Sequence, residues 1–131
     1  MIQKQGLQQI ADFDVETGVR ELINRGNRVF LLPRGIKDKR AFFEGIRKSL
    51  PLDPPVVGDH SWDALSDSLW TGLDGVDANA IAIIWPGSVE MAKSQPKDFE
   101  IAKSILSDLT GSLADTEVTV GNVKHVVVVL A

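Results

Sequence analysis

Apolar residues recur at helical spacing in four stretches of the chain and are consecutive in three others. In the helical stretches an apolar side chain returns every third or fourth residue; these stretches are residues 14–24, 38–50, 59–73 and 97–113. The consecutive runs lie within residues 28–33, 80–85 and 124–131, and the last contains four valines in a row. Runs of this kind are typical of strands that are buried on both faces.

Long connections that carry the predicted helices separate the three runs. Parallel strands need crossover connections of this length, whereas antiparallel strands can be joined by a short turn, and such crossovers are almost always right-handed. We therefore predict an α/β fold in which helices pack against a small three-stranded parallel sheet. Residues 1–12 are rich in glutamine and fit either a disordered end or an edge element.

The helix predicted within residues 59–73 has an apolar and an acidic side. Asp63 and Asp67 are four residues apart, so their side chains lie one turn above the other on the same face. Ser61 fits the N-cap position, and Gly72 fits a stop near the end. The stripe expected to face the core is Trp62, Leu65, Leu69 and Leu73.

Length and composition predict one globular domain without a metal or cofactor. The chain has 131 residues, of which 44% are apolar and 24% charged, so its core needs no disulfide. It has no cysteine and two well-separated histidines, which leaves no obvious zinc site. Glutamines interrupt the apolar residues near the N-terminus, and apolar stretches are shorter than about ten residues. We therefore expect no signal peptide, no membrane span and a cytoplasmic location.

The net charge of −4 is distributed unevenly. Residues 1–48 contain ten Lys and Arg against six Asp and Glu, whereas residues 49–131 contain four against twelve. No basic residue lies between Lys48 and Lys93, a span that holds six aspartates. Such a block repels phosphate, which argues against nucleic acid as a partner. A charge run is usually a solvated face, but this one is concentrated around a single amphipathic helix.

Asp63 and Asp67 can be interpreted in three ways. Like charges at this spacing cost a helix roughly a few tenths of a kcal/mol. In the first reading the helix dipole offsets that cost and the carboxylates face water; in the second the pair awaits a cationic partner. The third makes them a catalytic acid and base, with His60 as a further member. Acid/base catalysis needs contrasting environments for the two carboxyls, and the sequence supplies no such contrast.

The segment Trp62-Asp-Ala-Leu-Ser-Asp-Ser-Leu69 resembles the Asp-Ala-Leu-x-Asp-x-Leu helix of the barstar family of intracellular ribonuclease inhibitors. The order of predicted elements is also similar to that of the family. The resemblance covers residues 28–131, so residues 1–27 look like an N-terminal extension with a short helix. It implies a barstar-like domain with a three-stranded parallel sheet. It also implies a protein of antitoxin or immunity type, which plugs the active site of a secreted bacterial ribonuclease inside the producing cell.

The resemblance assigns roles to particular residues. The second aspartate of the family's motif enters the ribonuclease pocket and the first lies beside it; by position these are Asp67 and Asp63. An acidic residue late in the long helix also contributes, and Asp108 is the nearest candidate. The family pattern has an aromatic residue just before the second aspartate, where this chain has Ser66. Trp70, one turn further, fits either a substitute ring or half-buried structure.

The family pattern also has tyrosines ahead of the acidic helix, whereas this chain has no tyrosine and carries Val56 and Val57 there. We expect the partner to be a basic extracellular ribonuclease of the barnase type or a related toxin. The alternative is an interaction module of the same fold that binds another basic partner. In either case the predicted partner-binding residues are Asp59, His60, Asp63, Ser66, Asp67, Trp70 and Asp108.

Overall fold

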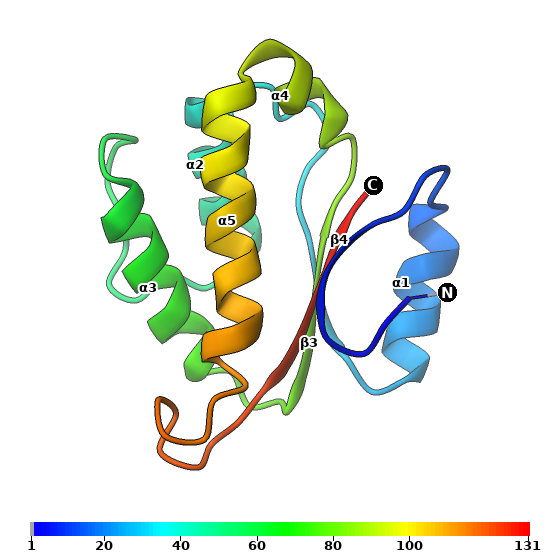
Figure 1. Cartoon of the computed structure of the whole chain (residues 1–131), viewed down its shortest axis with the longest axis vertical. Helices are drawn as coiled ribbons and strands as arrows, with labels where there is room; N and C mark the ends of the chain where they lie inside the picture. Colours follow the sequence, from blue (N-terminus) through cyan, green and yellow to red (C-terminus); the bar gives the residue numbers. More distant parts are fainter. Residues whose placement is uncertain (1) are drawn as a thin grey trace.

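The structure, a computed structural model, describes residues 2–131. It is built around one parallel sheet, with helices on both faces (Figure 1). The elements in chain order are β1 (Gly6–Gln9), α1 (Val15–Asn24), β2 (Arg28–Leu31), α2 (Lys39–Ser49), α3 (Trp62–Asp74), β3 (Ala80–Trp85), α4 (Val89–Ser94), α5 (Pro96–Ser112) and β4 (His125–Leu130).

The predicted α/β class is confirmed, and the number of strands is corrected from three to four. The strands lie in the order β1-β4-β3-β2, and every neighbouring pair is parallel. The additional strand, β1, comes from the glutamine-rich start of the chain, so the edge element is the reading that holds. It was hard to recognise because Leu7 is its only large apolar residue, which suits a strand with one free edge.

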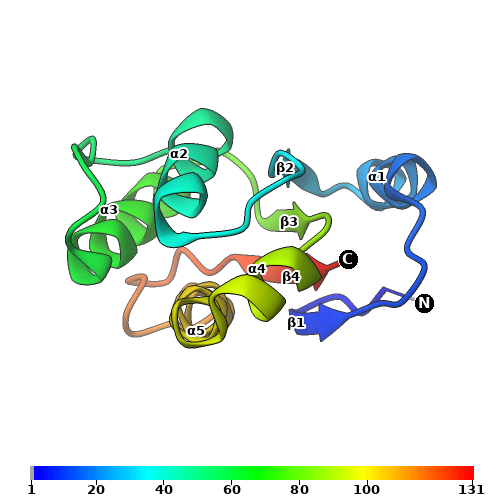
Figure 2. The same ribbon diagram turned by 90° about the horizontal axis from the view of Figure 1, so that it is seen from above.

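The central strands β3 and β4 are buried on both faces, as their consecutive apolar residues predicted, whereas β2, for which the same was expected, is an edge strand that is only partly buried. Alternate side chains point to opposite faces of a sheet. One set packs against α2, α3 and α5 in the main core, and the other set faces α1 (Figure 2). The set that faces α1 is Ala82, Ile84, Val127 and Val129. Because full burial of one such Val or Ile side chain contributes roughly 1.5–3 kcal/mol, the sheet depends on cover from both sides.

The cover on the α1 face comes from residues that precede Arg28. Leu22 is fully buried there, and the rest of this second core outside the sheet is Ile2, Ile10, Phe13 and Val19. Without these residues, four side chains of the central strands would face water. The domain boundary predicted at residue 28 stays a prediction, but the residues before it belong to the same sheet and cover it.

Side-chain caps fix the start of three helices. Asp14, Asp38 and Ser61 each accept a hydrogen bond from the backbone N–H three residues further on, at 3.3, 2.8 and 3.0 Å. Each cap satisfies a donor that would otherwise have no partner within the helix. Asp14 also accepts a bond from the Thr17 hydroxyl, and these hydrogen bonds to Thr17 lower the pKa of the Asp14 carboxyl.

Gly72 lies inside α3 and does not end it, which corrects the predicted stop. The helix continues to Asp74. A Cβ atom at Gly72 would overlap the backbone carbonyl of Pro51. The glycine is therefore needed for close approach: the proline-rich loop that leads into α3 packs directly on the backbone of that helix.

We expect Gly72→Ala to lower the free energy of unfolding by about 1–3 kcal/mol, because the new methyl group must displace the loop backbone. Gly111→Ala is the matched control, since Gly111 also lies in a helix and a Cβ there meets open space. That control should raise the free energy of unfolding by about 0.5–1 kcal/mol. Urea denaturation measures both, and equal effects of the two substitutions would contradict the packing described here.

Candidate functional site

Helix α3 is a rigid platform because one of its sides is fully buried. Leu65, Leu69 and Leu73 have no exposed surface and pack in the main core, as the predicted stripe requires. Trp62, the fourth member of the stripe, is only partly buried. The cap at Ser61 fixes the first turn. The backbone positions from which the outer side chains of α3 project are therefore fixed as well.

Asp63 and Asp67 project from the outer side of α3 into solvent. Both are exposed, and within residues 2–131 neither carboxylate takes part in an ion pair. Asp63 lies in the first turn, where the helix dipole favours a negative charge, but Asp67 lies beyond it and receives less of this compensation. The dipole therefore accounts for Asp63 better than for Asp67.

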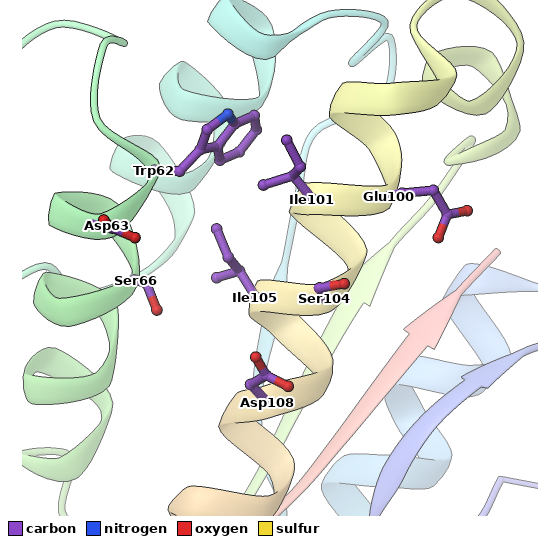
Figure 3. A pocket seen from close by; sticks show the side chains of 8 residues that line it. All are labelled: Trp62, Asp63, Ser66, Glu100, Ile101, Ser104, Ile105 and Asp108. Atoms are coloured by element: carbon purple, nitrogen blue, oxygen red, sulfur yellow. The ribbon is translucent and has the colours of Figure 1, made fainter.

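An open groove of about 360 Å³ lies between α3 and α5 (Figure 3). Its apolar part consists of Trp62 from α3 and of Ile101 and Ile105, which point from α5 toward α3. Its polar part includes two of the predicted residues on α3, Asp63 and Ser66. The structure thus brings residues 62–66 of the acidic helix together with the middle of the long helix.

The groove carries negative charge and no positive charge in its lining. Asp63, Glu100 and Asp108 are its three carboxylates, all of them are exposed, and no lining residue is Lys or Arg. In Figure 3 the Glu100 side chain extends away from α3, so Asp63 and Asp108 are the carboxylates nearest the groove itself. An acidic rim beside an apolar floor fits a lysine or arginine side chain, which has an apolar stem and a cationic head.

Five residues of the groove were not predicted as site residues: Trp62, which was predicted only for the core, and Glu100, Ile101, Ser104 and Ile105. The sequence did contain a signal for two of them, since Ile101 and Ile105 are four residues apart and lie next to the predicted core stripe of α5; Ile105 is itself buried in the main core. Ile101 remains 40% exposed. What the sequence did not contain was the identity of the helix that faces these isoleucines.

The other predicted residues lie outside the groove. Asp67 is not part of its lining, although it shares the outer side of α3 with Asp63. Trp70 is partly buried against the main core, which favours its structural reading. Asp59 lies in a separate small cleft beside two arginines of α2. His60 is exposed, and its backbone carbonyl accepts a hydrogen bond from Lys39 Nζ at 3.2 Å.

Trp62 places an aromatic ring at the groove. Its ring centroid is 5.2 Å from that of Phe43 and 6.0 Å from that of Phe42 in the core. Lys39 Nζ lies 5.2 Å from the centroid of the Trp62 ring, within the range of a cation–π contact. Trp62 therefore serves the core, as the stripe predicted, and also lines the groove.

Residues 2–131 contain neither a metal-binding cluster nor a membrane-spanning helix. No group of three or more His, Asp or Glu side chains is placed to hold a metal ion. No helix is long and apolar enough to cross a membrane.

Because Asp67 has no ion-pair partner within residues 2–131, Asp67→Ala should not destabilise the isolated protein. We expect an unchanged free energy of unfolding, or a gain of about 0.2–0.5 kcal/mol from relief of the repulsion by Asp63. Asp38→Ala is the contrasting control, because it removes the cap of α2 and should cost about 0.5–2 kcal/mol. Thermal and urea unfolding compare the two variants. A loss at Asp67 as large as that at Asp38 would mean that Asp67 has a structural role.

Comparison with known proteins identifies the family of the chain but supplies no related structure. The model of the family described as Barstar (barnase inhibitor) matches residues 28–123, which is most of the chain and includes both α3 and α5. No curated protein and no solved structure matches the chain. The family is one of inhibitors rather than enzymes, so it lends no support to the reading of Asp63 and Asp67 as a catalytic pair. The chain belongs to the barstar family of barnase inhibitors.

Proposed function

We propose that this chain inhibits a basic secreted ribonuclease, of the barnase type or a related toxin, by filling the active-site cleft of that enzyme. The contact is made by the acidic face, which we define as Asp63, Asp67 and Asp108 with the groove between α3 and α5. The role is of antitoxin or immunity type, exercised in the cytoplasm of the producing cell before the ribonuclease is exported.

The observation that carries the proposal is the exposure of Asp63 and Asp67 together with their lack of ion pairs within residues 2–131. Both are exposed and without an ion pair in the described chain, and the helix that carries them is buried on its other side. Since no Lys, Arg or His side chain of residues 2–131 forms an ion pair with these carboxylates, their full attraction is available to a cationic partner. A stiff helix also loses little conformational entropy when it binds.

The chemistry of RNA cleavage explains why carboxylates suit this target. An enzyme that cleaves RNA must hold a phosphate, and Arg, Lys and His side chains are the groups that do so. A carboxylate held at the right place accepts the same hydrogen bonds as a phosphate oxygen. The surrounding negative charge of residues 49–131 further increases the rate of encounter with a basic protein.

The groove and the loop that precedes α3 supply further contacts to the ribonuclease. These contacts take the place of the aromatic residues in the family pattern. Asp63 and Asp108 flank an apolar floor that fits a basic side chain from the rim of the enzyme's cleft. Trp62 supplies a ring whose position is fixed by the core. Val57, in the loop before α3, is 96% exposed and supplies an apolar contact where the family pattern has a tyrosine.

One specific feature favours a second candidate, an interaction module that binds another basic protein. The residue before the second aspartate is Ser66, and the chain contains no tyrosine. Aromatic side chains commonly supply much of the energy of an interface. A partner with a differently shaped cleft would therefore use the same carboxylates without being a ribonuclease.

The test is a titration of the whole chain into a barnase activity assay. We expect inhibition, and we expect the combined change Asp63→Ala and Asp67→Ala to abolish it. Truncating one partner of a buried charge pair typically costs about 2–5 kcal/mol, a range to which complexes of this family themselves contributed. The double variant should keep its fold, because neither carboxylate forms an ion pair with any other residue in the described part of the chain.

Asp77→Asn is the matched control, since Asp77 belongs to the same acidic block, is exposed and lies outside the groove. It should leave inhibition unchanged. Inhibition that survives the double substitution would overturn the site. Binding of barnase without inhibition, or capture of only non-ribonuclease basic proteins through the same two aspartates, would replace the first candidate with the second.

A further inference from the structure

A second cavity lies at the amino-terminal ends of the strands, on the face of the sheet that α1 covers. Its volume is about 880 Å³, within the size range of small-molecule sites. Figure 1 shows the N-terminal segment, in dark blue, curving between α1 and the starts of β3 and β4. The strands contribute Ala80 and His125, which pair across β3 and β4 at their first residues. The α1 side contributes Arg25 and Asn27.

The cavity is distinct from the site proposed for the ribonuclease. It lies across the sheet from α3 and α5, and apart from Ala80 its lining comes from outside the part of the chain that the family model matches. The segment Ile2–Gln5 forms one wall, so the cavity exists because of the residues that precede the family's domain.

The charge of this cavity is opposite to that of the groove. Its lining includes Lys4, Arg25 and His125, and none of its lining residues is acidic. Lys4 is exposed and forms no ion pair within residues 2–131. Arg25 is partly neutralised by Glu21 at 2.7 Å, which lies outside the cavity. Lys4 is therefore the cation most available to a ligand.

Hydrogen bonds hold the walls in place. Arg25 donates to the backbone carbonyl of Ile2 at 2.7 Å, which ties the N-terminal segment to the end of α1. Gln5 joins two further elements: its Oε1 lies 3.3 Å from His125 Nδ1, and its Nε2 donates to the carbonyl of Thr110 in α5 at 3.3 Å. Ile2 is buried and Ala80 points toward α1, so the interior also has an apolar part.

We propose that this cavity binds a small organic anion with an apolar body. The head group lies at Lys4, where amide side chains and an imidazole supply further donors. The body lies against Ile2, Ala80 and the carbon stems of the basic side chains. Neither an inorganic anion nor a neutral apolar molecule uses both parts of the cavity. The proposal does not rest on the function proposed for the acidic face.

Three probes distinguish the need for an anionic head group from the need for an apolar body. Each is titrated into the full chain and followed by fluorescence and two-dimensional NMR. 8-Anilinonaphthalene-1-sulfonate has both an anionic head and aromatic rings, N-phenyl-1-naphthylamine has the rings alone, and inorganic phosphate has the charge alone. We expect saturable binding of the sulfonate, with amide shifts at Gln5, Asn27 and His125. The other two probes should bind at least about tenfold more weakly.

Two substitutions test the parts of the cavity one at a time. Lys4→Gln should weaken binding of the sulfonate about threefold or more, whereas Lys97→Gln, on the exposed start of α5, should not change it. Ala80→Leu should fill the interior and weaken binding about tenfold; if that variant unfolds, the Lys4 comparison decides. The proposal is overturned if the sulfonate does not saturate, if its shifts map to the groove between α3 and α5, or if Lys4→Gln and Lys97→Gln behave alike.

Discussion

Burial of β3 and β4 on both faces is the constraint on which the rest of the structure depends. Two adjacent parallel strands made almost entirely of Ala, Ile and Val cannot leave either face in water. The chain meets this requirement with α2, α3 and α5 on one side, and with α1 and the N-terminal segment on the other. Because α3 and α5 are both needed on the same face, they are forced into adjacent positions, and the groove between them follows from that packing.

The contrast between the buried side and the exposed side of α3 follows from the same constraint. Its leucines are committed to the core, which leaves the outer side free to carry residues that contribute nothing to folding. Asp63 and Asp67 are such residues, since no cation of the described chain pairs with them. A structural role would have placed an arginine or lysine nearby, as Glu16, Glu21 and Glu44 each have on their own helices. Uncompensated charge on a rigid support is what recognition of a basic cleft requires.

Much of the fold could be predicted from the sequence because its strongest signals are local. The valines of β4, the leucines of α3 and the cap at Ser61 each act within a few residues, and all appear where expected. β1 was predicted only as one of two alternatives, an edge element or a disordered end, because Gly-Leu-Gln-Gln has no strand pattern of its own and is held by pairing with β4. Gly72 was misread for a similar reason. Its role depends on Pro51, which is close in space but far along the chain.

The acidic residues of the candidate site could be predicted from the sequence, but the apolar floor of the groove could not. The spacing of Asp63 and Asp67 identifies an acidic helix face, and the resemblance to the family, which has an acidic residue late in the long helix, adds Asp108. The sequence did not reveal that Ile101 and Ile105 face Trp62, because the relative orientation of two helices is a property of the packed core. For the same reason, Asp59 and His60 are near Asp63 in sequence but lie outside the groove, where side chains of α2 donate hydrogen bonds to the backbone carbonyls of Gly58 and His60.

Hydrogen exchange of the chain in complex with barnase tests the central claim most directly. If the acidic face enters the ribonuclease cleft, backbone amides in the first two turns of α3 and in the middle of α5 should exchange more slowly in the complex than in the free chain. Amides of α1 and β1, on the far side of the sheet, should exchange as before. Protection of α1 and β1 with no change in α3 would contradict the account, because the protein would then bind through the face that carries no acidic groove.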